Sequence, residues 1–571
     1  MNYLRKMRFG RAEIGLVGIV TIAVIIRILL IAQGWPGTNS DEATMGLMAL
    51  HIANNGELPI FFYGQNYMGA LEAYLAAGFF HFFAPSLFAL RLSLVIMFAL
   101  FLFVLYALSC LLYSRKVALW SCLLLSLGSV EMLTRQTKAV GGALETLLFG
   151  ALAMLLSTWL VLSWSPTYGF KEYRQRSWLY LCLGVSIGLG IWSHLLIIPF
   201  VGMACLLLLC FCRRELFSLG GLALCCGILC GAFPLMLFNL QHPSENSLIT
   251  FLHLNNAGGM ATTSTTMQEH SLWDSLLGTT LFSLPLATGA TPICMASTTP
   301  GVWRGQLSSC MVWQGIWGGT FLLLLSCSTC LVAYQLFRLA RLYKQSADTM
   351  KVRPQIVRLV ARVFLLLCGW GTIFSYLLSP APALVPITSA RYLVGLLIVT
   401  PTLVAFLLEC PLPLFSFRRV LEKVSLSLAV LLVIVLGYGT YTAFLQVPDV
   451  QKINEQQEAL IQNLLQRNVT DIYSDYWTCN WLIFQSRERI ICSVVDDSLE
   501  QGQNRYPSYQ DEVKMAEKAF YLLPSGSSGD KNLQQRLSLL QIPCQQITIE
   551  NYHLYVPVTS SPTRSCLNPN A

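Results

Sequence analysis

Gly34-Trp35-Pro36-Gly37-Thr38-Asn39-Ser40-Asp41-Glu42-Ala43 follows the first hydrophobic segment of the chain, Ile14–Ala32. Gly and Pro interrupt that hydrophobic helix. Asn39 or Ser40 can then cap a new helix over Asp41–Asn54, with two carboxylates in its first turn. No Lys or Arg occurs between Gln33 and Pro85. Because unneutralised carboxylates beside a membrane are costly, the stretch predicts a functional site.

The composition is that of a membrane protein. Of 571 residues, 55% are hydrophobic and 12% are charged, and the mean hydropathy is +0.58, which excludes an ordinary soluble domain. Apolar runs of about 20 residues recur, each long enough to cross a bilayer as a helix. No small-residue cleavage site follows the first run, so we expect a retained helix rather than a signal peptide. Eleven spans are predicted, at 14–33, 86–112, 117–133, 143–163, 178–193, 195–211, 216–238, 311–336, 359–378, 393–409 and 425–445.

The distribution of Lys and Arg predicts the orientation of these spans. With a cytoplasmic N-terminus, the cytoplasmic segments hold 21 basic residues, whereas the outer loops before residue 446 hold four. This positive-inside bias is typical of multi-pass membrane proteins. We therefore expect a plasma-membrane protein whose C-terminal segment is extracytoplasmic. The net charge of +8 comes from the cytoplasmic anchors, and no basic face suited to nucleic acid is evident. The four outer basic residues are Arg135, Lys138, Arg304 and Arg391.

The composition changes at about residue 446. Residues 446–571 carry ten basic and fourteen acidic groups with ordinary apolar content, so we predict a small soluble domain after a membrane domain of residues 1–445. Alternating helical and strand patterns predict an α/β fold for it. The expected helices are Glu455–Gln466, Asp475–Arg487, Met515–Leu523 and Asn532–Leu540, and the expected strands are Val469–Tyr473, Arg489–Val494 and Gln546–Ile549.

Most of the 19 cysteines lie within hydrophobic helices, where Cys acts as a small apolar residue. The four in the C-terminal domain make an even set in a compartment that can be oxidising, so disulfides are possible there, with open connectivity. Cys294 and Cys310 are another possible pair. No cysteine pair has metal-site spacing with histidines, so we predict no metal site and no cofactor, and whether a metal is required stays open. The four are Cys479, Cys492, Cys544 and Cys566.

Two outer loops are long enough to hold structure of their own. The first, residues 34–85, carries the predicted helix Asp41–Asn54, which is amphipathic and expected on the membrane surface. A second interfacial helix is expected from Glu72 to Phe83. The long loop 239–309 is polar, except for a hydrophobic stretch at Leu276–Ala287 that we expect to enter the interface.

Asp41 and Glu42 are the first candidates for chemistry. Acidic residues are common in the first turn of a helix, where they interact with its dipole, and this is the plainer interpretation. The functional interpretation is that one carboxylate serves as general base on a hydroxyl or amine acceptor during sugar transfer. Since neighbouring helical residues point in different directions, Asp41 is the favoured base and Glu42 an orienting or substrate-contacting residue.

Three outer cations are candidates for binding phosphate. Arg135 and Lys138 are held at the outer surface against the general trend; snorkelling is the plain alternative. Arg391 offers forked donors suited to phosphate, or else packs against the outer domain. Glu145 lies just inside the fourth span and can pair with Lys138. Arg91, a lone charge in the second span, either snorkels or joins the phosphate site.

Aromatic residues follow the first outer helix, in the stretch Phe61-Phe62-Tyr63-Gly64-Gln65-Asn66-Tyr67-Met68-Gly69. Tyr63 and Tyr67 are candidates for stacking on a sugar or an isoprenoid chain. An interfacial aromatic belt is the alternative.

In topology over residues 1–410, and in sequence at Ser40-Asp41-Glu42-Ala43 and more weakly at Ala390-Arg391-Tyr392-Leu393, the chain resembles the GT-C fold glycosyltransferases. The nearest types are the protein O-mannosyltransferases and lipid A aminoarabinose transferases of the family 39 type. The resemblance implies a polyprenyl-phosphate sugar donor, an inverting single displacement of a hexosyl or pentosyl group on the outer face, and Asp41 as the catalytic carboxylate. The chain lacks a Lys-Pro-Pro motif and room for an inserted lumenal domain in loop 239–309, which leaves the acceptor class open.

The sequence therefore predicts a polytopic α-helical, GT-C-like membrane glycosyltransferase with about eleven transmembrane helices and a small C-terminal α/β domain. Its partners would be a polyprenyl-phosphate sugar donor, a lipid, glycan or protein acceptor, and membrane lipids. A transporter or lipid flippase is the rival hypothesis, although neither inverted repeats nor midplane broken helices are evident. A non-catalytic assembly protein is the third. Transfer to a covalent product, rather than flux into vesicles, distinguishes the first from the second.

Overall fold

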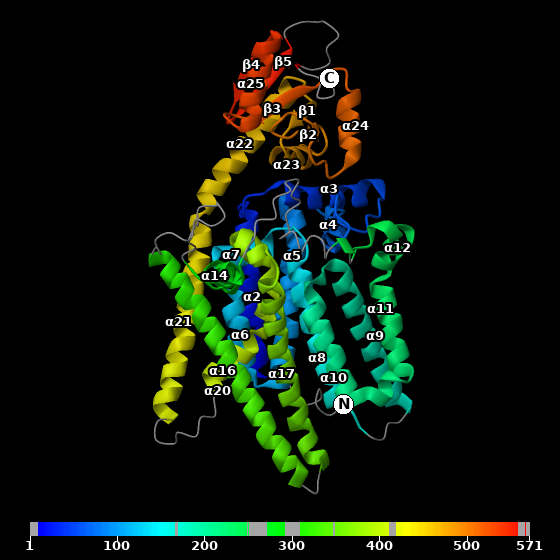
Figure 1. Cartoon of the computed structure of the whole chain (residues 1–571), viewed down its shortest axis with the longest axis vertical. Helices are drawn as coiled ribbons and strands as arrows, with labels where there is room; N and C mark the ends of the chain where they lie inside the picture. Colours follow the sequence, from blue (N-terminus) through cyan, green and yellow to red (C-terminus); the bar gives the residue numbers. More distant parts are fainter. Residues whose placement is uncertain are drawn as a thin grey trace.

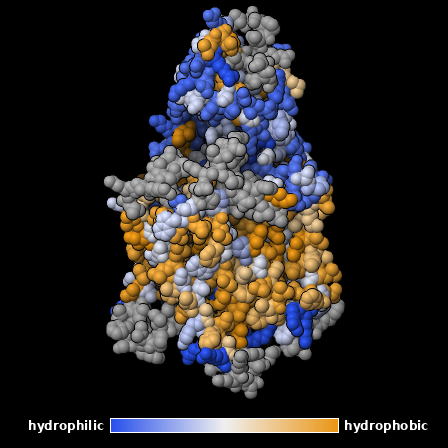
Figure 2. All heavy atoms as spheres, viewed as in Figure 1, coloured by the Kyte–Doolittle hydropathy of each residue, from blue (hydrophilic) through white to orange (hydrophobic). Residues whose placement is uncertain are grey.

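The computed structural model of the chain describes residues 10–165, 170–247, 249–250, 271–291, 309–345, 349–409, 418–557 and 566. A helical bundle forms the lower part and a domain with a β-sheet stands on one end of it (Figure 1). On the face in view, hydrophobic residues predominate over the bundle, and hydrophilic residues predominate over the domain above it (Figure 2). The molecule is a polytopic membrane protein with a small C-terminal α/β domain, as predicted.

Eight helices of the described residues are long and apolar enough to cross a membrane, or ten if two bent pairs are each counted as one span. The predicted span 178–193 lies within α9, Phe170–Ser193, which carries Lys171, Arg174 and Arg176 in its first turns and is not among them. The count of eleven therefore stays a prediction. The eight spans are Arg11–Ala32, Leu87–Leu112, Ala143–Leu162, Leu195–Leu216, Ser309–Arg341, Val352–Leu377, Pro386–Glu409 and Lys423–Gln466.

The remaining helices of the membrane part complete the bundle and its outer loops. In loop 239–309 the hydrophobic stretch Leu276–Ala287 forms short helices. Leu284 and Leu286 in this stretch are buried. The bounds are α2 Arg11–Ala32, α5 Leu87–Leu112, α8 Ala143–Leu162, η1 Leu195–Ile197, α10 Ile198–Leu216, η2 Pro243–Glu245, α14 Leu272–Gly278, η3 Thr279–Ser283, α15 Leu284–Thr288, α16 Ser309–Gln345, α17 Thr349–Leu377, α18 Ala381–Leu384, α19 Pro386–Ser389, η5 Ala390–Val399, α20 Thr400–Glu409 and α21 Arg418–Leu445.

The predicted span 117–133 is wrong as a single straight helix. It is α6, Arg115–Ser126, followed by α7, Val130–Thr137, at 88° to it. Ser129 caps the new helix by accepting a hydrogen bond from Met132 N at 3.4 Å, so the chain can restart in another direction. The break places Arg135 on α7 and Lys138 just after it. In the same way α11, Leu219–Gly231, bends by 65° into α12, Phe233–Gln241.

The first outer loop forms two helices, the first of which carries the acidic motif. The helix predicted at Asp41–Asn54 is α3, Ser40–Asn55, and Asn39 caps it, with its Oδ1 accepting from Glu42 N at 3.0 Å. The second is α4, Leu71–Phe80. Helix α3 packs between α4 and the C-terminal domain, and its position on the membrane surface stays a prediction. A Cβ on Gly46 would come within 2.6 Å of the Phe484 ring, so the two parts meet closely there.

The C-terminal domain contains a five-stranded mixed sheet in the order β2-β1-β3-β5-β4. Strands β1, β2 and β3 are parallel, and β5 pairs antiparallel with both β3 and β4. The expected helix Met515–Leu523 is wrong: a helix ends at Met515, and Phe520–Pro524 forms a central strand, where a short buried apolar run fits better. The elements are α22 Val447–Gln466, β1 Asp471–Ser474, α23 Tyr476–Ser486, β2 Ile491–Val494, α24 Pro507–Met515, β3 Phe520–Pro524, α25 Ser528–Leu540, β4 Cys544–Ile549 and β5 Tyr552–Pro557.

Disulfides and a long helix hold this domain in place. Cys479–Cys492 joins α23 to β2, and Cys544–Cys566 joins β4 to the C-terminal segment, which confirms that the four cysteines pair. Of the other expected pair, Cys294 lies outside the described residues. Helix α21 leads through Gln446 directly into α22, so one nearly continuous helical rod rises from the bundle to the sheet (Figure 1).

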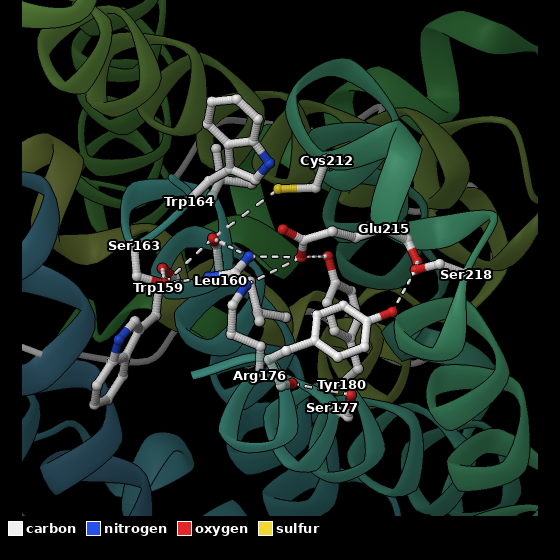
Figure 3. A network of polar contacts seen from close by, with 12 residues as sticks. Trp159, Leu160, Ser163, Trp164, Arg176, Ser177, Tyr180, Cys212, Glu215 and Ser218 are labelled. Carbon is white, nitrogen blue, oxygen red and sulfur yellow. Dashed lines mark hydrogen bonds and ion pairs between the residues drawn. The ribbon is translucent and has the colours of Figure 1, made fainter. Parts of the chain in front are cut away.

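A buried ion-pair network closes the end of the bundle where α8 and α10 finish and α9 begins (Figure 3). Arg176 donates from Nη2 to Glu215 Oε2 at 2.7 Å and from Nη1 to Ser163 Oγ at 2.7 Å. Tyr180 donates its hydroxyl to the same Glu215 oxygen at 2.9 Å, and the Leu160 carbonyl accepts from Arg176 at 2.9 Å. These contacts join α9 to α10 and to the end of α8, so the network stabilises the packing of three helices.

Candidate functional site

Asp41 lies where the bundle meets the C-terminal domain. Its side chain is 27% exposed, and its Oδ1 accepts hydrogen bonds from the Tyr476 hydroxyl and from Arg505 Nη2, the latter at 3.2 Å. Ser40 donates its hydroxyl to the Tyr476 carbonyl. The first turn of α3 is therefore tied to the start of α23. Among the described residues no partner is found for Asp41 Oδ2, so one carboxylate oxygen is available to a ligand.

Glu42 differs from Asp41 in its burial and in its partners. It is fully buried and forms a bidentate pair with Arg91, at 2.8 Å to Nε and 2.6 Å to Nη2. It also accepts from Ala139 N at 3.1 Å, while Arg91 donates to the Gly34 carbonyl at 3.1 Å. Arg91 does not snorkel, and the charges of Arg91 and Glu42 neutralise each other. The pair fixes α3, α5 and the segment after α7 to one another, and Lys138 is the residue before the anchored Ala139.

Two of the predicted cations, Lys138 and Arg391, have N–H donors that bond to no carboxylate of the described chain. Lys138 is mostly buried and, within the part of the chain that the structure describes, makes neither an ion pair nor a side-chain hydrogen bond. Burial lowers its pKa, although the carboxylate of Glu42 opposes that shift. Arg391 contacts Tyr392, with Nη2 donating to the hydroxyl at 3.4 Å, and has no carboxylate partner in the described chain. Both lie within range of the charge of Asp41.

Arg135 is close to Arg391 but already paired. Its Nη2 donates to Glu131 one turn earlier on α7, and its Nε is buried without a partner in the described residues. Arg135 therefore contributes little net charge to the site.

The two predicted tyrosines have separate surroundings. Tyr67 is mostly buried, and burial, with Tyr392 beside it, raises its pKa. Arg391, Arg505 and Asp41 are all close enough to affect it, so Tyr67 belongs to the Asp41 group. Tyr63 does not: its hydroxyl donates to Glu57 at 2.7 Å and lies 2.9 Å from His51 Nδ1, within a cluster that joins α3 to the C-terminal domain.

Glu145 makes no ion pair with Lys138 in the described chain, so the expected pairing with Lys138 is wrong. Both of its carboxylate oxygens are buried without a hydrogen-bond partner among the described residues, and the carboxyl group of Glu72, on α4, is buried close to it. Burial and the proximity of Glu145 raise the pKa of Glu72 well above its ordinary value. Glu72 accepts from Gly141 N at 3.0 Å, so it holds the other end of the segment that carries Lys138.

Sequence reasoning missed Arg505 and Tyr476, which complete the surroundings of Asp41. Arg505 lies 464 residues from Asp41 in a polar stretch of the C-terminal domain, with no motif around it. A groove of about 880 Å³ lies elsewhere on that domain. Asp471, Glu512 and Lys518 are among the residues that line it, and none of the predicted site residues does. Among the described residues no group of three His, Cys, Asp or Glu side chains is placed to hold a metal ion.

The comparisons with known proteins show a shared fold. No family model matches the sequence, and no curated protein matches it. The structure of ArnT from Cupriavidus metallidurans bound to undecaprenyl phosphate superposes with a TM-score of 0.54 at 11% identity, covering 95% of this chain and 98% of that one. The apo ArnT structure has a TM-score of 0.55 at 11% identity, covering 96% and 99%. An oligosaccharyltransferase from Archaeoglobus fulgidus has a TM-score of 0.47 at 11% identity, covering 89% of this chain and 69% of that one.

The agreement with ArnT runs over nearly the whole of both chains, from the membrane bundle through the C-terminal domain. The chain accordingly has the same fold as ArnT, the GT-C fold.

Proposed function

We propose that this protein is a membrane glycosyltransferase that moves a sugar from a polyprenyl-phosphate-linked donor to a lipid, glycan or protein acceptor. The single observation that supports it best is Asp41: a partly exposed carboxylate at the junction of the two domains, with one oxygen bonded to Arg505 and the other free, and with Lys138 and Arg391 close enough to feel its charge. A general base and a set of phosphate-binding cations are the two parts that such a transfer needs.

In the proposed reaction, Asp41 Oδ2 accepts the proton of the acceptor hydroxyl or amine as that group attacks the anomeric carbon. A bond from the acceptor to the sugar forms while the bond from the sugar to the phosphate oxygen breaks. The phosphate leaves on its lipid with one more negative charge. Lys138 and Arg391 stabilise that charge, since their N–H donors are not committed to protein carboxylates.

The remaining predicted residues have supporting roles in this proposal. Glu42 and Arg91 fix the position of α3 and of the Lys138 segment, and Glu72, beside Glu145, fixes the other end of that segment. Tyr67 contacts the sugar or the start of the isoprenoid. The likeness to ArnT, solved with undecaprenyl phosphate, supports a polyprenyl phosphate as the carrier. The disulfides and the basic cytoplasmic segments support an outer-face reaction and a cytoplasmic N-terminus.

Asp41→Asn tests the proposal. In membranes supplied with a polyprenyl-phosphate sugar, we expect transfer to fall by about 10²–10⁴-fold, because the amide cannot take the proton. Asp449→Asn is the matched control, since Asp449 is also in a first helical turn but is exposed on α22. Normal transfer by the Asp41 variant would show that Asp41 is not the base. Uptake of lipid-linked sugar into sealed vesicles without a covalent product would favour the transporter hypothesis.

A further inference from the structure

Arg505 is unusual in the way its donors are used. Only 9% of its side chain is exposed. Its Nε donates to the Tyr476 hydroxyl at 2.9 Å and its Nη2 to Asp41 Oδ1 at 3.2 Å. Its Nη1 is buried and has no hydrogen-bond partner in the described chain. A buried guanidinium nitrogen without an acceptor is costly, so this nitrogen points to a ligand.

Two aromatic rings also fix the orientation of the Arg505 guanidinium. Its Cζ lies 5.2 Å from the centre of the Phe62 ring and 5.4 Å from that of Tyr476, one ring from each domain. A Cβ on Gly64 would come within 3.2 Å of Arg505 Cδ, and Gly64 has a φ of +69°, so its backbone approaches closely. Because Nη1 and Nη2 belong to one planar group, an anion on Nη1 would lie beside the carboxylate of Asp41.

The charges around Asp41 do not balance. Glu42 is neutralised by Arg91, and Arg135 is neutralised by Glu131. The cations that remain are Lys138, Arg391 and Arg505, against the single carboxylate of Asp41, which leaves a net positive site. The lipid phosphate that leaves in the proposed reaction is a monoester, which carries about −1.5 to −2 charges near neutral pH and accepts several hydrogen bonds, so it matches both the charge and the free donors.

We infer that Arg505 is a phosphate-binding residue that the C-terminal domain contributes to the donor site. Its Nη1 donates to an oxygen of the lipid-linked phosphate while Nη2 and Nε stay on Asp41 and Tyr476. One side chain thus sets the distance between the base and the leaving group. This inference rests on the proposed function, and it makes the C-terminal domain part of the donor site rather than a cover over it.

Equilibrium binding to the purified full chain tests the inference without any transfer step. The probe is a polyprenyl phosphate without sugar, and the matched polyprenol lacks the phosphate. Arg505→Gln should weaken binding of the phosphate by about 10–100-fold, the usual worth of hydrogen bonds to a charged group. Binding of the polyprenol should not change. Arg467→Gln, at an exposed position on the same domain, is the control and should bind both lipids normally.

A second variant guards against a change in domain docking. Arg505→Lys keeps the charge but has one ammonium group, which cannot hold Asp41 and the phosphate in the planar arrangement, so about a tenfold loss is expected. Unchanged phosphate affinity in Arg505→Lys or Arg505→Gln would overturn the inference. Phosphatidic acid is a third probe, measured in parallel. If the Arg505 variants lost affinity for phosphatidic acid but not for polyprenyl phosphate, the inference would also fail, because Arg505 would then bind an acceptor-like lipid. If Asp41→Asn still transfers sugar while Arg505→Gln loses phosphate binding, the catalytic proposal fails and this inference stands.

Discussion

Adjacent residues with the same charge have opposite fates in this protein. Asp41 is partly exposed and keeps an unpaired oxygen, while Glu42 is fully buried against Arg91. A buried ion pair that loses one partner typically costs about 3–5 kcal/mol, so Glu42 is explained by folding alone. Asp41 has no comparable structural need, since its partners Tyr476 and Arg505 come from the other domain. The contrast strengthens the assignment of Asp41, and not Glu42, to chemistry.

Lys138 carries a prediction about pH. Burial lowers its pKa, so it loses its proton at a lower pH than an exposed Lys does. Below that lowered pKa the ammonium is charged and can bind phosphate; as pH rises through it, donor affinity should fall. Lys138→Arg stays charged throughout, so its affinity for a polyprenyl phosphate should stay constant over the range in which the natural protein weakens. Binding titrations at several pH values measure this. The same decline in both proteins would exclude Lys138 as the titrating cation.

At the scale of elements, α3 is the joint between the membrane bundle and the C-terminal domain. His51 on α3 is buried; its Nδ1 lies 2.9 Å from the Tyr63 hydroxyl, and its Nε2 lies 3.0 Å from both Glu488 Oε1 and the Tyr509 hydroxyl. This cluster is the second tie between the domains, beside the Asp41 contacts. It explains why the C-terminal domain covers one side of α3.

Glu488 makes the strength of this joint depend on pH. Its hydrogen bond with His51 lowers its pKa, so the carboxylate contributes stability that is present above the ordinary pKa of Glu and is lost as pH falls through the lowered value. Glu488→Gln should loosen the domain near neutral pH, and its difference from the natural protein should vanish in acid. Limited proteolysis of the α21–α22 rod measures the loosening. Glu500→Gln, at an exposed position, should behave as the natural protein; an equal change there would refute the specific role of Glu488.

Over the whole molecule, one rod and one interface orient the C-terminal domain on the bundle. Helix α21 runs along the bundle, α22 continues from it into the C-terminal domain, and α23 packs on α3 beside the candidate site (Figure 1). The position of Arg505 depends on this arrangement, because it reaches Asp41 only when the domain is docked. Integrity of the C-terminal domain should therefore matter for donor binding at a site most of which lies on the bundle.

The Cys479–Cys492 disulfide tests that dependence. It closes a loop of 13 residues between α23, which carries Tyr476, and β2. Replacing both cysteines with Ala should cost the domain about 3 kcal/mol of stability in the chain-entropy estimate for such a loop. We expect a lower thermal unfolding temperature and weaker phosphate binding, while binding of the uncharged polyprenol persists. The Cys225→Ala variant, in an apolar helix, is the control. Full phosphate affinity in the double variant would separate the site from the disulfide.

Local sequence was sufficient for much of the outline. Hydrophobic length predicts the long membrane helices, because a bilayer demands about 20 apolar residues wherever the helix lies in the fold. The caps at Asn39 and Gly56 define α3, since cap residues act within one turn. Asp41, Lys138 and Arg391 are candidates because charged residues beside a membrane are costly, and their roles stay a proposal. Composition alone likewise predicts a domain boundary at residue 446.

Tertiary structure decided what these residues touch. The 88° turn between α6 and α7 depends on what surrounds Ser129, and no pattern of hydrophobicity records it. The strand Phe520–Pro524 was mistaken for helix because a short apolar run fits either until its neighbours in the sheet are known. Glu145 lies close to Glu72, and Glu42 pairs with Arg91. Asp41 pairs with Arg505, which is 464 positions away in the sequence. Such pairings arise only when distant segments pack together, because charge partners are chosen by distance in space rather than by position along the chain.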